Sequence, residues 1–256
     1  MTKELTAMIQ AAEAAGKIVK SYFGEALEVT EKTSAIDLKT EADLKSEAAV
    51  VEILTKAFPD YGIYSEEGGG AVKASAYRFI VDPLDGTHNF TLGMPYFSVA
   101  IALVKGEEIL AGVVYNPILE HLYYAEKGSG AWFGQTKLKV NNQSDLTKAV
   151  IGAGLGYDNY QADGLNEKIR KIVARKLDTW ATSLDFCSLA AGKIEAIVNN
   201  NNDICDFTAG KLIALEAGAQ VTDFTGQKEV SDLNQVFVIS NGTAIHQQLL
   251  DIIAGT

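Results

Sequence analysis

The chain has 256 residues and a formal net charge of −11, and 47% of its residues are hydrophobic. This balance argues against nucleic acid as the main partner, because binding to a phosphate backbone needs a basic surface and the chain has no long Lys/Arg cluster. No apolar run is long enough to span a membrane, and residues 1–4 lack the apolar core of a signal peptide. The expected location is therefore cytoplasmic, where Cys187 and Cys205 are expected to be reduced, buried thiols.

Two helices and a sheet are predicted for the N-terminal half. Apolar residues recur with helical spacing over residues 3–22, which predicts a helix that ends near Gly24. A second helix is expected over residues 43–57, with Asp43 at its N-terminal end and Pro59 beyond its last turn. The runs that predict strands, rich in β-branched and aromatic residues, are 61–65, 79–81, 96–104, 109–115 and 122–125.

Strands and helices alternate after about residue 140, which is typical of an α/β arrangement. The strands predicted there are 150–154, 194–198, 221–224 and 236–240, and the helices are 165–176, 207–217 and 244–253. We therefore expect an α+β half, residues 1–140, and an α/β half, residues 141–256. The two halves are expected to form one compact unit with the active site between them.

Two carboxylates three residues apart, Asp82 and Asp85, flank Pro83. Because Pro83 is expected to end the strand, both carboxylates can project toward one point, and the Leu84 carbonyl can add a third oxygen ligand for a hard metal ion. The N–H groups from Gly86 onward are expected at a helix N-terminus, where anions bind readily. All these residue types also form ordinary turns, which is the alternative for this stretch alone.

Further acidic residues lie at the edges of other expected elements, namely Asp43, the pair Glu66-Glu67, and Asp206. Taken singly, Asp43 is typical of a helix cap and the glutamate pair is typical of surface charge. Together with the two aspartates around the proline, these residues predict an oxygen-rich site for Mg²⁺ or a similar hard ion. A zinc site is not expected, because the three histidines are isolated and no Cys/His spacing suits zinc.

Four segments resemble motifs of the inositol monophosphatase family, a family of lithium-sensitive, Mg²⁺-dependent sugar-phosphate phosphatases. Residues 82–90 match Asp-Pro-Ile/Leu-Asp-Gly-Thr-x-Asn-Phe, and residues 37–43 resemble Asp-x-x-Thr-x-x-Asp. Residues 65–67 resemble Gly-Glu-Glu, and residues 205–210 resemble the second signature around Trp-Asp-x-Ala-Gly. The order and separations agree, so the resemblance spans nearly the whole chain.

The resemblance implies a layered αβαβα sugar-phosphatase fold, a homodimer, and a phosphomonoesterase that uses metal-activated water without a phosphoenzyme. The residues implied to bind two or three Mg²⁺ ions are Glu66, Asp82, Leu84 through its carbonyl, Asp85 and Asp206. Thr87, with Asp43, is implied to position and deprotonate the attacking water, and the Gly86 and Thr87 N–H groups to hold the phosphate. Further substrate contacts are implied for Ala181, Thr182 and Asn199. Lys32 matches a family lysine near the active site, although a surface lysine is an equal alternative.

The chain departs from the family pattern where substrate is recognised. Trp180 stands where inositol-specific members carry a glycine, and Asn199 replaces a glutamate that contacts an inositol hydroxyl. Cys205 replaces a family tryptophan as well, but this is a packing change that leaves the metal ligand Asp206 intact. The resemblance puts an inositol-1-phosphate-like polyol phosphate first as substrate. Fructose 1,6-bisphosphate, a 3′-phosphorylated nucleotide and histidinol phosphate are alternatives. Outside the enzymes, the alternative is a non-catalytic metal-binding regulatory protein that keeps the fold.

Overall fold

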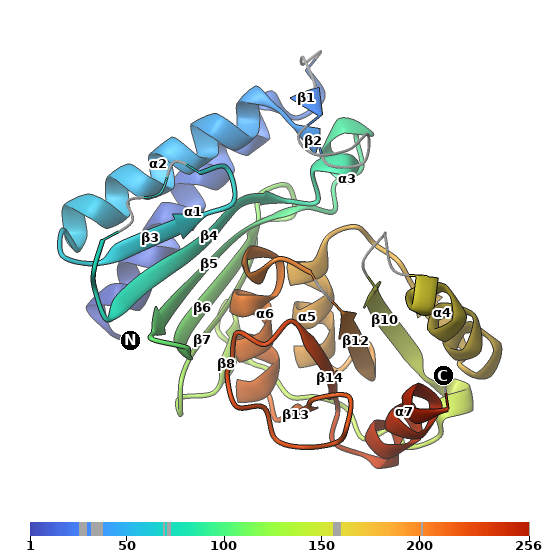
Figure 1. Ribbon diagram of the computed structural model, residues 1–256. Coiled ribbons are helices and arrows are strands. Elements are labelled where there is room, and N and C mark those ends of the chain that lie inside the picture. The colour runs from blue at the N-terminus through green and yellow to red at the C-terminus, as the bar shows by residue number, and fades with distance from the viewer. Residues whose placement is uncertain are drawn as a thin grey trace.

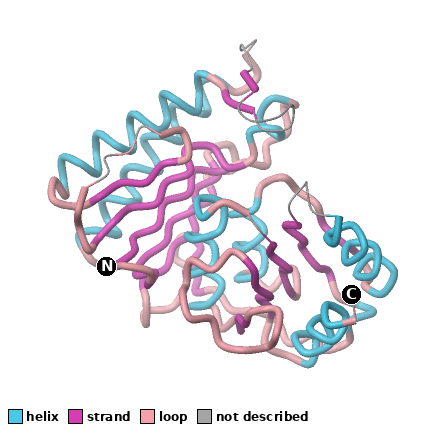
Figure 2. Tube along the Cα trace, viewed as in Figure 1, coloured by secondary structure: helices cyan, strands magenta, loops and turns pink. Residues whose placement is uncertain are grey.

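Figure 1 shows the computed structural model, which describes residues 1–25, 30–31, 38–68, 70, 73–155, 160–200 and 202–255. Its helices and two main sheets stack in five layers (Figures 1 and 2). The first layer is α1 (Lys3–Tyr22) with α2 (Glu41–Ala57), the middle layer is α5 (Thr182–Ala190) with α6 (Ile204–Glu216), and the last is α4 (Tyr160–Ile172) with α7 (Ala244–Ala254). The αβαβα arrangement confirms the predicted fold class.

The larger sheet lies between the first and middle helix layers and has the strand order β3-β4-β5-β6-β7-β8-β9. Its strands are β3 (Gly62–Ser65), β4 (Tyr77–Asp85), β5 (Ser98–Lys105), β6 (Glu108–Asn116), β7 (His121–Glu126), β8 (Ala131–Phe133) and β9 (Thr136–Lys137). The β3–β4 pair is parallel and all the other pairs are antiparallel, so the predicted meander is confirmed. A two-stranded sheet, β1 (Thr30–Glu31) with β2 (Leu38–Lys39), precedes α2.

The smaller sheet lies between the middle and last helix layers and has the order β11-β10-β12-β14-β13. Its strands are β10 (Val150–Leu155), β11 (Arg175–Leu177), β12 (Ala196–Asn200), β13 (Gln220–Thr222) and β14 (Val236–Ser240), with the 3₁₀ turn η1 (Leu146–Lys148) before β10. The helix predicted over residues 165–176 is wrong at its end, because α4 stops at Ile172 and β11 then pairs in parallel with β10. Strand pairing across the sheet overrides the local helical pattern there.

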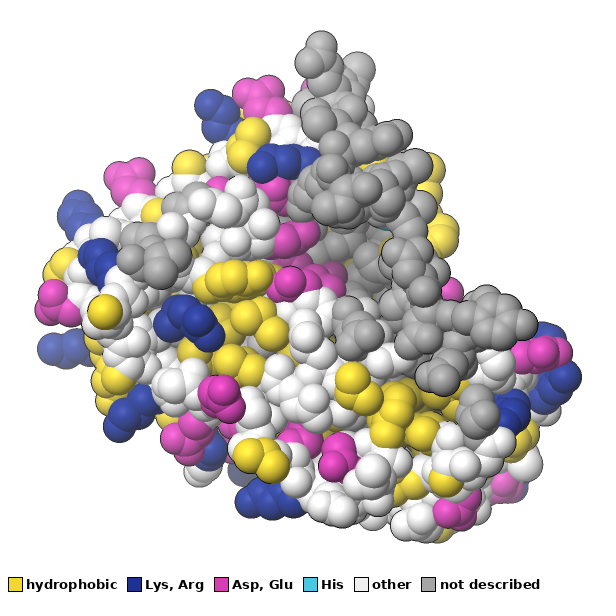
Figure 3. Space-filling model, viewed as in Figure 1, with side chains coloured by type: hydrophobic (Ala, Val, Ile, Leu, Met, Phe, Trp, Pro, Cys, Tyr) yellow, Lys and Arg dark blue, Asp and Glu magenta, His cyan; other side chains and the backbone are white. Residues whose placement is uncertain are grey.

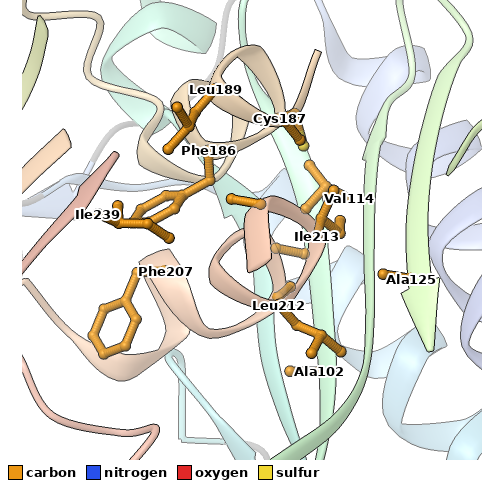
Figure 4. Close-up of a cluster of buried hydrophobic side chains, with 14 of the residues drawn as sticks. Ala102, Val114, Ala125, Phe186, Cys187, Leu189, Phe207, Leu212, Ile213 and Ile239 are labelled. Atoms are coloured by element: carbon orange, nitrogen blue, oxygen red, sulfur yellow. The ribbon is translucent and has the colours of Figure 1, made fainter. Parts of the chain in front are cut away.

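Alternate residues of β5 pack into two different hydrophobic cores. Val99 and Ile101 are buried against the α1 and α2 layer, whereas Ala100 and Ala102 face the middle helix layer. Figure 4 shows that second core, where side chains of α5 and α6 meet those of both sheets. At Gly112 on β6, an added Cβ would lie 2.5 Å from a carbonyl oxygen of α6. The glycine and the small side chains therefore let α6 lie close to the larger sheet, which fixes the position of its first turn.

The expectation that Pro83 ends its strand is wrong. β4 continues through Pro83 to Asp85, and its register with β5 shifts between Asp82, which pairs with Ala100, and Asp85, which pairs with Ser98. Side chains three residues apart on a regular strand point to opposite faces, and one extra residue in a bulge cancels that alternation. The bulge, rather than a strand end, therefore lets both carboxylates face one site.

Both cysteines are free and buried, as expected. Within the ranges that the structure describes, no helix has the combined length and apolarity that crossing a membrane requires.

Candidate active site

A pocket of about 310 Å³ opens where the bulged end of β4, the start of α3 (Thr87–Thr91) and the first turns of α5 and α6 meet. Six acidic residues contribute to its lining, which are Glu66, Asp82, Asp85, Asp178, Asp185 and Asp206. Figure 3 shows acidic side chains gathered in a hollow near the middle of one face. All five residues implied to bind metal line this pocket, including Leu84.

Asp82 is the most deeply buried of these carboxylates, with 1% of its surface exposed. Its Oδ1 accepts the N–H of Leu84 at 3.0 Å, which orients the carboxylate across the bulge. Burial raises the pKa of Asp82 well above its usual range, and the charges of Glu66, Asp85 and Asp206 raise it further. The side chain thus lies in an excess of negative charge.

Asp85 joins the larger sheet to the start of α5. Its Oδ1 accepts the N–H of Thr182 at 3.0 Å, and its Oδ2 accepts the N–H of Ser183 at 2.9 Å and the Ser98 hydroxyl at 3.2 Å. The helix residue Ala181 has no side chain that could cap these N–H groups, so a carboxylate 96 positions earlier in the chain supplies the cap. Burial raises the pKa of Asp85 to about 7, although the hydrogen bonds from Ser183 and Ser98 lower it.

Asp206 lies in the first turn of α6, and its backbone carbonyl accepts the Ser183 hydroxyl at 2.7 Å. Burial raises the pKa of Asp206 well above its usual range, as do the charges of Asp85 and Glu66. Glu66 follows β3, and its N–H donates to the Val81 carbonyl at 3.1 Å, which holds this glutamate beside β4. Three separate elements therefore direct carboxylates into one pocket.

The donor set fits a hard divalent cation such as Mg²⁺. All the donors are carboxylate or carbonyl oxygens, which such ions prefer over nitrogen and sulfur. Burial, together with the charges of neighbouring carboxylates, raises the pKa values of Asp82, Asp85 and Asp206, so a bound cation would favour their charged forms. No three His, Cys, Asp or Glu side chains in the described part of the chain form a ready-made ion site. Because like charges repel, we expect a bound cation to draw the carboxylates together.

Thr87 and Asp43 lie at the N-termini of two helices and are joined by a hydrogen bond. The Thr87 hydroxyl lies 3.2 Å from Asp43 Oδ1 and 3.0 Å from the Leu84 carbonyl oxygen, so its single hydrogen has two acceptors within reach. Asp43 is 1% exposed, and its Oδ2 accepts both the N–H and the hydroxyl of Thr40 at 2.8 and 2.6 Å. The structure therefore combines the capping role of Asp43 with contact to Thr87.

Not every residue implied to bind substrate lies in the pocket lining. Gly86, Thr87 and Thr182 line it, whereas Ala181 and Asn199 are fully buried outside it. The Asn199 amide donates to the Gln235 carbonyl at 2.8 Å, and its Oδ1 accepts the Asn202 amide at 3.0 Å. Both ends of Asn199 are thus used inside the protein. Lys32 and Asp37 lie outside the described residues.

Asp185 was missed by the sequence reasoning although it lines the pocket. Its Oδ1 accepts the Thr179 hydroxyl at 2.8 Å and the Tyr96 hydroxyl at 3.4 Å. Burial raises the pKa of Asp185 to about 7, against the effect of these hydrogen bonds. Its spacing of three residues from Thr182, one turn along a helix, was the signal that could have indicated it.

Two aromatic side chains also line the pocket, His88 and Trp180, with ring centroids 5.9 Å apart. Trp180 has a φ of +55°, a left-handed conformation that a bulky residue rarely adopts. Asn89 fixes the neighbouring backbone, since its Nδ2 donates to the carbonyls of Thr179 and Tyr96, at 2.7 Å each.

Comparison with known proteins places this site in a family. The model of the inositol monophosphatase family matches residues 1–254. The chain is 37% identical to an inositol-1-monophosphatase of Caulobacter vibrioides, over 95% of this chain and 98% of the relative. It is 33% identical to a fructose-1,6-bisphosphatase/inositol-1-monophosphatase of Thermotoga maritima, over 93% and 91% of the two chains. The crystal structure of the extragenic suppressor protein suhB from Bartonella henselae matches with a TM-score of 0.91 and 34% identity, over 98% of each chain.

Proposed function

Because the chain belongs to the inositol monophosphatase family of phosphoric monoester hydrolases, we propose that it hydrolyses a small phosphorylated alcohol with the help of Mg²⁺. The observation that carries this proposal is the convergence of hard oxygen donors on the pocket that Gly86 and Thr87 also line. Within the proposal, Glu66, Asp82, the Leu84 carbonyl, Asp85 and Asp206 hold two or three ions. Bound Mg²⁺ supplies a water of lowered pKa and neutralises charge on the phosphate and on the departing alkoxide.

The chain's own residues position the reactants. The Thr87 oxygen accepts a hydrogen bond from the attacking water, and the proton that the water loses moves toward Asp43 Oδ1, which lies 3.2 Å from the Thr87 hydroxyl. The two hydrogen bonds from Thr40 keep Asp43 in place. The N–H groups of Gly86 and Thr87 donate to phosphate oxygens at the start of α3.

The family relatives put a polyol or sugar phosphate first as substrate. One relative is named an inositol-1-monophosphatase and another a fructose-1,6-bisphosphatase/inositol-1-monophosphatase, so inositol 1-phosphate and fructose 1,6-bisphosphate are the first esters to assay. We propose that the enzyme is a lithium-sensitive homodimer, as the family resemblance implies, and that it acts in the cytoplasm, as expected from the sequence.

The test is release of inorganic phosphate from a panel of esters, measured with Mg²⁺ and with EDTA. The panel holds inositol 1-phosphate, fructose 1,6-bisphosphate, glycerol 2-phosphate and adenosine 3′-phosphate. We expect release with Mg²⁺ and loss of release in EDTA. Absence of release from every ester, or equal release in EDTA, would refute the proposal and favour a non-catalytic role.

A further inference from the structure

We propose that Trp180 and His88 form an aromatic contact surface for the alcohol part of the substrate, and that the pocket prefers phosphomonoesters with a planar aromatic ring. This inference rests on the proposed hydrolase function and specifies its substrate class. An aryl ester and a nucleoside phosphate both carry such a ring, and the experiment below separates them.

The first support is the exposure of Trp180. Of its surface, 46% is exposed, and it lines the same pocket as the acidic residues. A single exposed tryptophan on a protein surface needs no explanation. Trp180 differs because a second ring, His88, lies 5.9 Å away at an interplanar angle of 49°, and both residues line the pocket that Gly86 and Thr87 also line. The two rings and the proposed phosphate position therefore belong to one pocket.

The second support is the backbone that presents Trp180. A φ of +55° strains the backbone of a residue that is not glycine. Contacts with the surrounding residues must therefore hold Trp180 in this conformation. Residues of α3 and α5 both bind the adjoining Thr179. Asn89 donates to the Thr179 carbonyl, and the Thr179 hydroxyl donates to Asp185. The Trp180 carbonyl oxygen also lies 3.2 Å from the position of a Cβ added at Gly86. The ring is therefore presented from a fixed loop.

The third support is what the rest of the lining offers. Ala153 and Ile197 are apolar residues of the lining, which also includes the polar residues Asn166, Asn202 and Thr182. By contrast, Asn199, the residue implied to contact a polyol hydroxyl, is fully buried and bonded at both ends of its amide. The ring faces and the apolar residues suit a flat aromatic ring, whereas the residue implied to bind a polyol hydroxyl does not line the pocket.

The kinetic test compares kcat/KM for phenyl phosphate, adenosine 3′-phosphate, cyclohexyl phosphate and inositol 1-phosphate in the wild type and in Trp180→Gly. Comparing each ester between two proteins cancels its intrinsic reactivity. Stacking on an aromatic side chain predicts a loss of about tenfold for the aromatic esters relative to inositol 1-phosphate. Glycine accepts a positive φ, so this variant is expected to keep the loop conformation.

Three further variants serve as controls. Trp180→Phe keeps a ring and is expected to recover most of the selectivity, and His88→Ala is expected to lose part of it. Trp132→Phe changes the second tryptophan of the chain, on β8 and outside the pocket lining, and is expected to leave the ratios unchanged. Equal losses for all four esters in Trp180→Gly, or an equal loss for the cyclohexyl and phenyl esters, would overturn the aromatic preference. A loss for phenyl phosphate alone would identify an aryl ester, and a loss for both aromatic esters would include the nucleoside.

A binding measurement tests the aromatic preference even if the protein hydrolyses none of these esters. In Trp132→Phe, Trp180 is the single remaining tryptophan, so its fluorescence reports on this loop alone. We expect phenylphosphonate, which cannot be hydrolysed, to quench this fluorescence in the presence of Mg²⁺ more strongly than methylphosphonate does. Equal quenching by the two phosphonates would overturn the inference. Selective quenching without phosphate release from any ester would retain the aromatic site and refute the hydrolase function.

Discussion

The metal-free protein is expected to lose stability as the pH rises from 5 to 8. Burial raises the pKa of both Asp85 and Asp185 to about 7 in the folded chain, whereas an unfolded aspartate has a pKa of about 3.9. Between these values the folded state binds more protons than the unfolded state. The free energy of unfolding therefore falls with rising pH throughout this window and becomes level above it.

The size of the effect follows from the same values. One carboxyl with a folded pKa of about 7 loses roughly 3 kcal/mol of stability between pH 5 and pH 8. Asp82 and Asp206 act in the same direction, since burial raises the pKa of each. His246 opposes the trend below about pH 6.5, because burial lowers its pKa and the neutral ring is the form that the fold favours. Below that pH the net fall is therefore smaller than the carboxyls alone would give.

Urea unfolding in EDTA at a series of pH values measures this dependence. Mg²⁺ is expected to reverse it, because a bound cation favours the charged carboxylates and stabilises the folded state most at pH 8. Asp206→Asn is the matched variant, since it removes one charge of the cluster and keeps the shape of the side chain. It is expected to be more stable than the wild type at pH 8 in EDTA and to gain less from Mg²⁺. A stability in EDTA that is flat or rising between pH 6 and pH 7 would refute the reasoning.

Three further substitutions test the packing and the catalytic pair. Thr87→Val should lower kcat by about 100-fold with little change in urea midpoint, and a normal kcat would exclude its role in positioning water. Gly210→Ala places a Cβ 2.6 Å from the Phe186 Cβ, between α5 and α6. The melting temperature should therefore fall by an amount that corresponds to about 1–3 kcal/mol of unfolding free energy. An unchanged melting temperature would contradict this close contact. Lys211 is fully buried and its Nζ lies 2.8 Å from Glu229 Oε2. Lys211→Met should cost about 3–5 kcal/mol by leaving that carboxylate unpaired, and Lys211→Met with Glu229→Gln should recover most of it in urea unfolding.

The spacing of apolar residues along the sequence predicted most of the fold. The helices over residues 3–22 and 244–253 and the strand over 236–240 agree with α1, α7 and β14 to within a residue. The two helices carry a regular apolar face against one neighbouring layer, and β14 is a short apolar run buried on both faces, so the local pattern reflects their burial. Much of the acidic cluster was likewise predictable, because Asp43, Glu66 and Asp206 lie at or beside the ends of elements that the pattern indicates.

The local patterns failed where tertiary pairing decides the outcome. Proline usually ends a strand, yet β4 absorbs Pro83 in a bulge because its pairing with β5 continues on both sides. Residues 175–177 continue a helical pattern but pair with β10 instead. The burial of Asn199 and the cap that Asp85 provides for α5 each depend on residues far away in the chain. No spacing in the sequence encodes such contacts.

The central claim is that the acidic pocket binds Mg²⁺ to hydrolyse phosphomonoesters. The most direct measurement is phosphate release as a function of Mg²⁺ concentration for the wild type, for Asp82→Asn, and for a control, Asp145→Asn, which alters an exposed turn outside the pocket lining. The account predicts saturable activation by Mg²⁺ in the wild type and the control. It also predicts a loss of orders of magnitude in Asp82→Asn, at an unfolding midpoint no lower than that of the wild type. Normal turnover in Asp82→Asn, or turnover that does not depend on Mg²⁺, would contradict it.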